Sequence, residues 1–206
     1  MQFQIYGHRH GDIILGQKEP YATLFYEICD ALDAVTDTQI ILEYDGIERA
    51  SKKSISQPIN RLIKREMVAR GWEAESYIFA DEYYQTDERG RASGIWRLDF
   101  AKDKLAVEVA FNHRSDISWN LLKPTLSSEL NHVPKAIQTE AGVIITATRD
   151  MKRAGGFDNA VGTFEDYVAY LKPMYHVLTV PLVIIGLEAP TSFRIAQRKV
   201  QRLRVN

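Results

Sequence analysis

Residues 96–111 read W-R-L-D-F-A-K-D-K-L-A-V-E-V-A-F, which predicts two β-strands joined by a tight polar turn at 101–104. The second strand is a continuous apolar run broken only by Glu108. Runs of this kind are typical of strands that are buried on both faces of a sheet. A carboxylate is costly in such a strand unless another group compensates its charge. Glu108 is therefore the residue of this stretch that most needs a partner.

A hairpin over this stretch would bring Asp99 of the first strand close to Glu108 of the second. Two adjacent carboxylates repel each other, and a divalent cation commonly relieves that repulsion. The first hypothesis is therefore a hard-metal site made by Asp99 and Glu108. Two simpler alternatives stay open, because two acids near a hairpin are a weak motif. Glu108 could face water on an edge strand, or it could pair with a buried arginine such as Arg97.

The composition describes an ordinary globular protein rather than a specialised class. The chain has 206 residues, of which 45% are hydrophobic and 26% are charged, enough for one domain with a real core. The net charge of −1 excludes a uniformly basic nucleic-acid binder but allows a local basic patch. The single cysteine, Cys29, excludes an intrachain disulfide framework. The sequence shows neither a secretory leader nor an apolar run of membrane-span length, so we expect a cytoplasmic protein without membrane contact.

The order of the predicted elements indicates one α/β domain over residues 1–206. The first part is predicted to be mainly helical, the middle part alternates strands and helices, and the last part is a basic tail; these parts are 1–71, 72–190 and 191–206. Helices are predicted over 20–35, from Pro58 to Gly71 and over 117–133, and buried strands over 142–147 and 181–186. This alternation predicts a central mixed β-sheet flanked by helices.

Two segments outside the hairpin have the composition of anion-binding loops. Lys52 and Lys53 are flanked by serines, of which Ser54 precedes the second helix, although a solvated loop is the simpler interpretation. Residues 149–156 are predicted to form a basic, flexible loop directly after a buried strand. Ligands of α/β sheets gather where strands end, so this position favours a binding role.

The order of motifs in residues 98–187 resembles one known family of enzymes. The hairpin sequence L-D-F-A-K-D-K-L-A-V-E-V-A-F is followed by S-E-L at 128–130, V-I-I-T at 143–146 and P-L-V-I-I-G-L at 181–187. This order is similar to that of the BglII/BstYI family of type II restriction endonucleases, within the PD-(D/E)xK nuclease superfamily. The resemblance implies a restriction-endonuclease-like core. It also implies a Mg²⁺-dependent homodimer that cuts a short palindromic site in double-stranded DNA, with a companion DNA methyltransferase protecting that site.

The resemblance assigns roles to individual residues. It implies that Asp99, Glu108 and the carbonyl of Val109 bind the metal. Ala110 departs from the pattern, because the superfamily places Lys, Glu or Gln there to position or deprotonate the attacking water. Candidates to replace it are Glu129, Lys123 and His113, and Glu129 is preferred because the family pattern also has an acid there. Alternatively, the substrate phosphate activates the water, or the chain is a weak or inactive nuclease.

The resemblance also predicts the DNA contacts. It implies that a segment after the second hairpin strand reaches into the major groove, that a basic loop also faces DNA, and that a Ser/Lys loop contacts the backbone. These residues are Asn112, His113, Arg114 and Ser115, then Arg149, Lys152 and Arg153, then Lys52, Lys53 and Ser54. Two further interpretations stay open: a non-specific or repair nuclease of the same superfamily, and a DNA-binding module that lost catalysis through Ala110.

Overall fold

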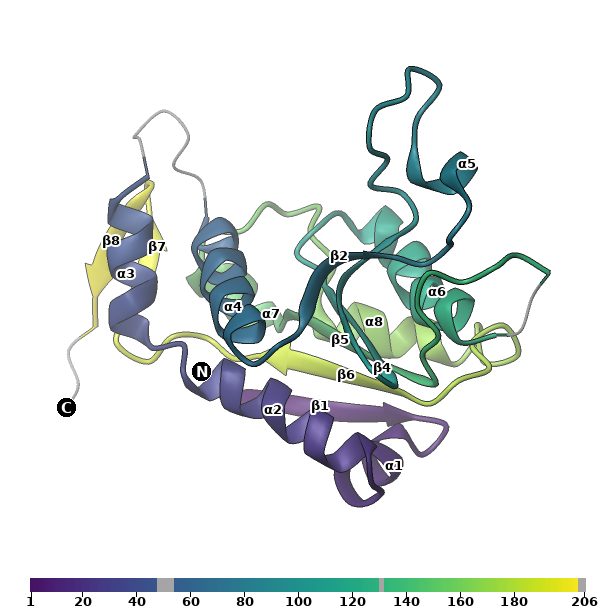
Figure 1. Cartoon of the computed structure of the whole chain (residues 1–206). Helices are drawn as coiled ribbons and strands as arrows, with labels where there is room; N and C mark the ends of the chain where they lie inside the picture. Colours follow the sequence, from purple (N-terminus) through teal and green to yellow (C-terminus); the bar gives the residue numbers. More distant parts are fainter. Residues whose placement is uncertain (48–53, 130–131, 204–206) are drawn as a thin grey trace.

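The fold is built on a six-stranded mixed β-sheet at the centre of a computed structural model, which describes residues 1–47, 54–129 and 132–203 (Figure 1). The strand order is β1-β6-β5-β4-β3-β2. Strands β4, β5 and β6 run parallel to one another, whereas β1, β2 and β3 pair antiparallel with their neighbours. The strands are β1 (Phe3–His8), β2 (Glu73–Tyr77), β3 (Arg97–Lys102), β4 (Leu105–Val109), β5 (Ala141–Ala147) and β6 (Leu182–Leu187).

Helices cover both faces of the sheet because successive side chains of its central strands point to opposite sides. Val143 and Ile145 of β5 face the principal apolar cluster with α2 and α4, while Ile144 faces a second cluster with α6 and α8. Every residue of β5 and β6 is buried, as expected for central parallel strands. The helices are α1 (Gly11–Gln17), α2 (Tyr21–Asp33), α3 (Asp37–Asp45), α4 (Ser56–Ala69), α5 (Glu82–Gln85), α6 (Ile117–Ser128), α7 (Arg149–Ala154) and α8 (Phe164–Leu171), with a 3₁₀ turn η1 (Arg114–Asp116).

The predicted mixed sheet with flanking helices is confirmed, and most differences concern where helices begin and end. The helix predicted over 117–133 ends at Ser128. The segment 149–156, predicted as a flexible loop, instead forms helix α7. The hydroxyl of Thr148 caps this helix by accepting a hydrogen bond from the backbone N–H of Met151 at 3.2 Å. Of the helices that the structure describes, none has the length and apolar character needed to cross a bilayer.

Residues 193–202 form a β-hairpin within the segment that the sequence predicted as a basic tail, of which residues 204–206 lie outside the described residues. Strands β7 (Phe193–Ala196) and β8 (Lys199–Arg202) pair antiparallel beside α3 (Figure 1). Phe193 is fully buried in the principal apolar cluster, which explains why this segment folds back onto the protein. Asp37 at the start of α3 accepts hydrogen bonds from the backbone N–H and hydroxyl of Ser192, at 3.0 and 2.7 Å. The hairpin is thus attached to the helical N-terminal part.

Candidate active site

The predicted hairpin forms, and it brings the two carboxylates together. Strands β3 and β4 pair Phe100 with Val107, and continuing this register places Asp99 opposite Glu108. Side chains at opposite positions of an antiparallel pair lie on the same face of the sheet. The backbone N–H of Val109 donates a hydrogen bond to Oδ2 of Asp99 at 2.6 Å, which fixes one carboxylate at the end of the neighbouring strand.

Glu108 is buried, with only 2% of its surface exposed, so the edge-strand alternative is wrong. The arginine alternative is also wrong, because the ion-pair partner of Glu108 is Lys123 from helix α6. Arg97 contributes its backbone carbonyl, which accepts a hydrogen bond from the Lys123 ammonium at 3.1 Å, while its guanidinium lies 3.7 Å from the carboxylate of Glu75. The lysine therefore compensates the carboxylate that the sequence left without a partner.

Only one oxygen of the Glu108 carboxylate is compensated. Oε2 pairs with Lys123, whereas the buried Oε1 has no hydrogen-bond partner among the described residues. Burial and, to a lesser extent, the nearby Asp99 carboxylate together raise the pKa of Glu108 to about 8, although the charge and hydrogen bond of Lys123 oppose both effects. Burial also raises the pKa of Asp99 above its ordinary value, against the opposing hydrogen bond from Val109 and the charge of Lys123. The surroundings thus do not fully neutralise the pair when both carboxylates are ionised.

These residues suit a hard divalent cation. They offer carboxylate oxygens, one of which is a buried acceptor with no donor. Among residues 1–47, 54–129 and 132–203, no group of three or more His, Cys, Asp or Glu side chains could hold a metal ion. A cation bound here would therefore need backbone carbonyls and water for the rest of its coordination. Mg²⁺ is commonly bound by one or two carboxylates while it keeps several waters, so the donor set fits that ion.

Ala110 takes no part in proton chemistry at this site. Its side chain is buried among apolar residues that include Ile117, Leu121 and Ile144. Its backbone N–H donates to the carbonyl of Ile145, and its carbonyl accepts from the hydroxyl of Thr146, both at 2.8 Å. Any group that assists the pair must therefore come from another element. Of the three candidates, Lys123 is the one that contacts Glu108.

Glu129 is not brought to the carboxylate pair. It lies six residues beyond Lys123 at the end of α6, roughly 9 Å further along the helix axis. Its exposed carboxylate accepts a hydrogen bond from Thr179, which precedes β6, so it lies near the start of the parallel strands. Glu108 lies near the carboxyl end of β4. The geometry thus gives no support for the expectation that Glu129 takes over the role that Ala110 cannot fill.

We accordingly expect Glu129→Gln to leave the rate of DNA cleavage within about twofold of the parent, because an exposed side chain distant from the reacting groups contributes little. Single-turnover cleavage of a plasmid checks this expectation. A hundredfold fall in rate, without a fall in thermal stability, would restore Glu129 to the catalytic centre.

The two predicted DNA-facing segments leave the sheet at the same edge. Strands β4 and β5 are parallel, so residues 112–115 and helix α7 both follow carboxyl ends of strands. Residues 112–115 also pair with the loop after α7. The Arg114 N–H donates to the carbonyl of Ala160 at 2.8 Å, and the Gly162 N–H donates to that of Asn112 at 3.1 Å. The two segments therefore form one continuous surface beside the carboxylate pair.

The basic side chains of this surface are not all equally available. The Lys152 ammonium donates to the carbonyls of Asn159 and Val161, both at 2.8 Å, so it supports the loop after α7. The arginines are exposed and pair with acids at the surface, where such pairs contribute little to stability and exchange readily. These pairs are Arg114 with Asp166, Arg149 with Glu165, and Arg153 with Asp150.

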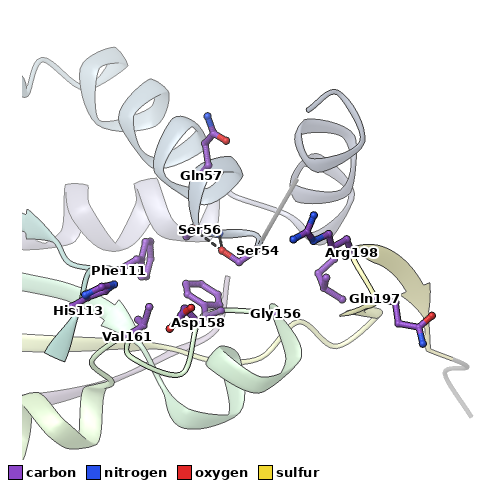
Figure 2. Close-up of a pocket in the computed structure, with 12 residues that line it drawn as sticks. Ser54, Ser56, Gln57, Phe111, His113, Gly156, Asp158, Val161, Gln197 and Arg198 are labelled. Carbon is purple, nitrogen blue, oxygen red and sulfur yellow. Dashed lines mark hydrogen bonds between the residues drawn. The ribbon is translucent and has the colours of Figure 1, made fainter. Parts of the chain in front are cut away.

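A cleft of about 620 Å³ joins Ser54 to His113, two residues that the sequence placed in separate DNA contacts (Figure 2). It begins at Phe111, two residues beyond the end of β4, and reaches the start of α4. Figure 2 shows that Gln197 and Arg198, from the turn of the β7–β8 hairpin, line its other end. The sequence placed Arg198 only in a basic tail, because nothing local indicated that the tail folds back. Lys52 and Lys53 lie outside the described residues.

Comparisons with known proteins agree with this architecture. A family model described as restriction endonuclease BglII/BglIII matches residues 3–187. A crystal structure of restriction endonuclease BglII complexed with a DNA 16-mer matches with a TM-score of 0.63 and 19% identity, covering 98% of this chain and 88% of that one. A structure of free BglII matches with a TM-score of 0.53 and 18% identity, covering 91% and 79%. A search of curated proteins found no match. Because the family model spans nearly the whole chain, this protein belongs to the BglII family of restriction endonucleases.

Proposed function

We propose that this restriction endonuclease is a Mg²⁺-dependent homodimer that hydrolyses phosphodiester bonds in a short palindromic site of double-stranded DNA. The observation that carries the proposal is the Asp99–Glu108 pair, with its uncompensated Oε1, at the sheet edge where the polar loops gather. The DNA 16-mer in the BglII complex supports DNA as the substrate. A companion methyltransferase with the same sequence preference would protect the host's own sites.

The cation would be held by the carboxylates of Asp99 and Glu108, with the carbonyl of Val109 as a backbone ligand. Bound there, Mg²⁺ would lower the pKa of a coordinated water and stabilise negative charge on the leaving oxygen. The protein's own part is to hold the two carboxylates rigidly. Pairing of β3 with β4 sets their separation, and the Val109 N–H fixes the orientation of Asp99.

Sequence reading would be carried out by the segment from Asn112 to Ser115, which is largely exposed and lies next to the carboxylates. Asparagine can pair with adenine and arginine with guanine in bidentate fashion. Arg149 and Arg153 on α7 are the second set of contacts, since both arginines are exposed and their present partners are the half-buried Glu165 and the exposed Asp150. Ser54 and Arg198, which line the cleft, would contact the DNA backbone.

A homodimer follows from symmetry rather than from any contact within this chain. A palindrome has two-fold symmetry, and a two-fold dimer presents one copy of the same reading surface to each half-site. One chain offers one Asp99–Glu108 pair, so cutting both strands in one binding event calls for two copies.

The test is incubation of the purified protein with plasmids of known sequence, in Mg²⁺, in Ca²⁺ and in EDTA. We expect discrete fragments in Mg²⁺ only, with ends that map to one palindromic sequence, and no fragments from Asp99→Asn. A smear would indicate a general nuclease. Tight binding without cutting would indicate the DNA-binding module that Ala110 left open. Analytical ultracentrifugation on a duplex with the mapped site should give two protein chains per duplex.

A further inference from the structure

Lys123 is the most unusual charged residue of the described structure outside the carboxylate pair. It is buried, with 8% of its surface exposed, and a lysine is seldom buried unless it is paired. Its ammonium contacts Glu108 and donates to the carbonyl of Arg97 at 3.1 Å. It also lies close enough to oppose the charge of Asp99. The Lys123 ammonium therefore interacts electrostatically with both carboxylates.

Lys123 lies on helix α6, which packs against the face of the sheet that includes Ala110 and Ile144. Asn120, one turn before it on the same helix, is also buried and donates to the hydroxyl of Tyr167 at 2.7 Å and to Oδ1 of Asn112 at 3.0 Å. These contacts fix the helix on the residues that surround the site. The small side chain of Ala110 lies under the same helix, packed against Leu121. A longer side chain at 110 would occupy the space that α6 now fills.

Charge counting indicates what happens to Lys123 when a divalent cation binds. When both carboxylates are ionised and no cation is bound, they face one ammonium, and the site has one negative charge in excess. With a divalent cation on the carboxylates, the pair is neutralised and Lys123 becomes an uncompensated buried cation. Such a cation is costly unless a new anion approaches it. The phosphodiester of bound DNA is an anion that must lie beside the same carboxylates.

We propose that Lys123 is a second cation of the cleavage centre. Without the divalent cation, its ammonium pairs with Glu108. With a divalent cation bound there, it donates hydrogen bonds to the scissile phosphate and to the attacking water, supplying from a helix what Ala110 cannot. This proposal rests on the proposed function. It makes Lys123 a competitor of the metal for Glu108 and a partner of the substrate in the reaction.

The test compares Lys123→Met and Lys123→Arg with the parent protein by three measurements. The first is Mn²⁺ binding by electron paramagnetic resonance. The others are binding, in Ca²⁺, of a plasmid fragment that the parent protein cuts, and single-turnover cleavage in Mg²⁺. Lys104→Met is the matched control, since Lys104 pairs with Glu140 at the protein surface. We expect Lys123→Met to bind Mn²⁺ about tenfold more tightly, because an electrostatic change equivalent to about one pKa unit corresponds to a factor of ten in affinity. We expect it to keep DNA binding within about threefold. Its cleavage should fall about a hundredfold or more, the usual effect of losing one donor at a developing charge.

Lys123→Arg keeps a charge and donors, and we expect it to retain at least about a tenth of the parental rate. If Lys123→Met does not fold, Lys123→Gln takes its place, because an amide can still donate to Glu108 and to the Arg97 carbonyl. Cleavage by the uncharged variant within threefold of the parent overturns the proposal, as does weaker Mn²⁺ binding, which would mean that Lys123 merely organises the metal site. A parent that binds Mn²⁺ and DNA but never cuts would refute the proposed function instead. The change in Mn²⁺ affinity would then still decide whether Lys123 competes for Glu108.

Discussion

Glu108→Gln is expected to reduce single-turnover cleavage of DNA by about a thousandfold or more. Glutamine keeps the size of the buried side chain and an acceptor for Lys123, but it removes the negative charge that would hold the cation. The Asp99 carboxylate alone cannot replace this charge, because one of its oxygens already accepts from Val109. We therefore expect Mn²⁺ binding to weaken together with cleavage.

Glu73→Gln is the matched control for this prediction. Glu73 carries the same side chain on strand β2 of the same sheet, but it is exposed to solvent. We expect the control to cut and to bind Mn²⁺ like the parent. Parental cleavage by Glu108→Gln, in preparations shown to be free of contaminating nuclease, would remove Glu108 from the metal site.

The second large effect is a loss of metal-free stability as the pH rises. The pKa of Glu108 is raised from 4.5 to about 8, so between these values the folded protein holds a proton that the unfolded chain has released. Stability from this group is therefore complete below about pH 4.5 and is lost as the pH rises through 8. Asp99, whose pKa is also raised, acts in the same direction. We expect a loss of roughly 2–5 kcal/mol between pH 5 and pH 9 in EDTA, or about 5–15 °C in Tm.

Thermal unfolding in EDTA across this pH range measures the effect. Glu108→Gln should show a distinctly shallower decline, because Asp99 is then the one titrating carboxylate left in the pair. Saturating Mg²⁺ should restore most of the parental Tm at high pH, since the ion favours the ionised carboxylates. Carboxylates whose pKa values are lowered, such as Glu66 and Asp166, influence stability only at more acidic pH. Equal pH slopes in the parent and Glu108→Gln would show that Glu108 does not carry the effect.

The sequence was sufficient to predict the sheet and the juxtaposition of Asp99 and Glu108, because both are local consequences of a hairpin. The alternation and length of the apolar runs also predicted the buried strands. What could not be predicted was the partner of Glu108. Lys123 lies fifteen residues further along the chain, and its contact depends on how α6 crosses β4. The same limit explains the preference for Glu129, since position in a motif does not reveal which end of a helix meets the site.

Packing against distant parts of the chain also determines the structure of residues 193–202. Their basic side chains indicated a solvated tail, but Phe193 and Ile195 alternate with exposed residues and anchor a hairpin in the core. Only that anchoring brings Arg198 to the cleft opposite His113. A local sequence pattern does not predict that a segment packs against a distant part of the chain.

The way residues 112–115 are held has a consequence for how this enzyme could diverge. The segment is framed by backbone groups: the Arg114 N–H meets the Ala160 carbonyl, and the Asn112 carbonyl meets the Gly162 N–H. Lys152 supports the opposing loop through carbonyls as well. Backbone groups persist through nearly every substitution. The identities of the exposed side chains at 113–115 can therefore change while the shape that presents them is inherited. With the proposed role of this segment in reading DNA, such changes would give new sequence preferences without a new fold.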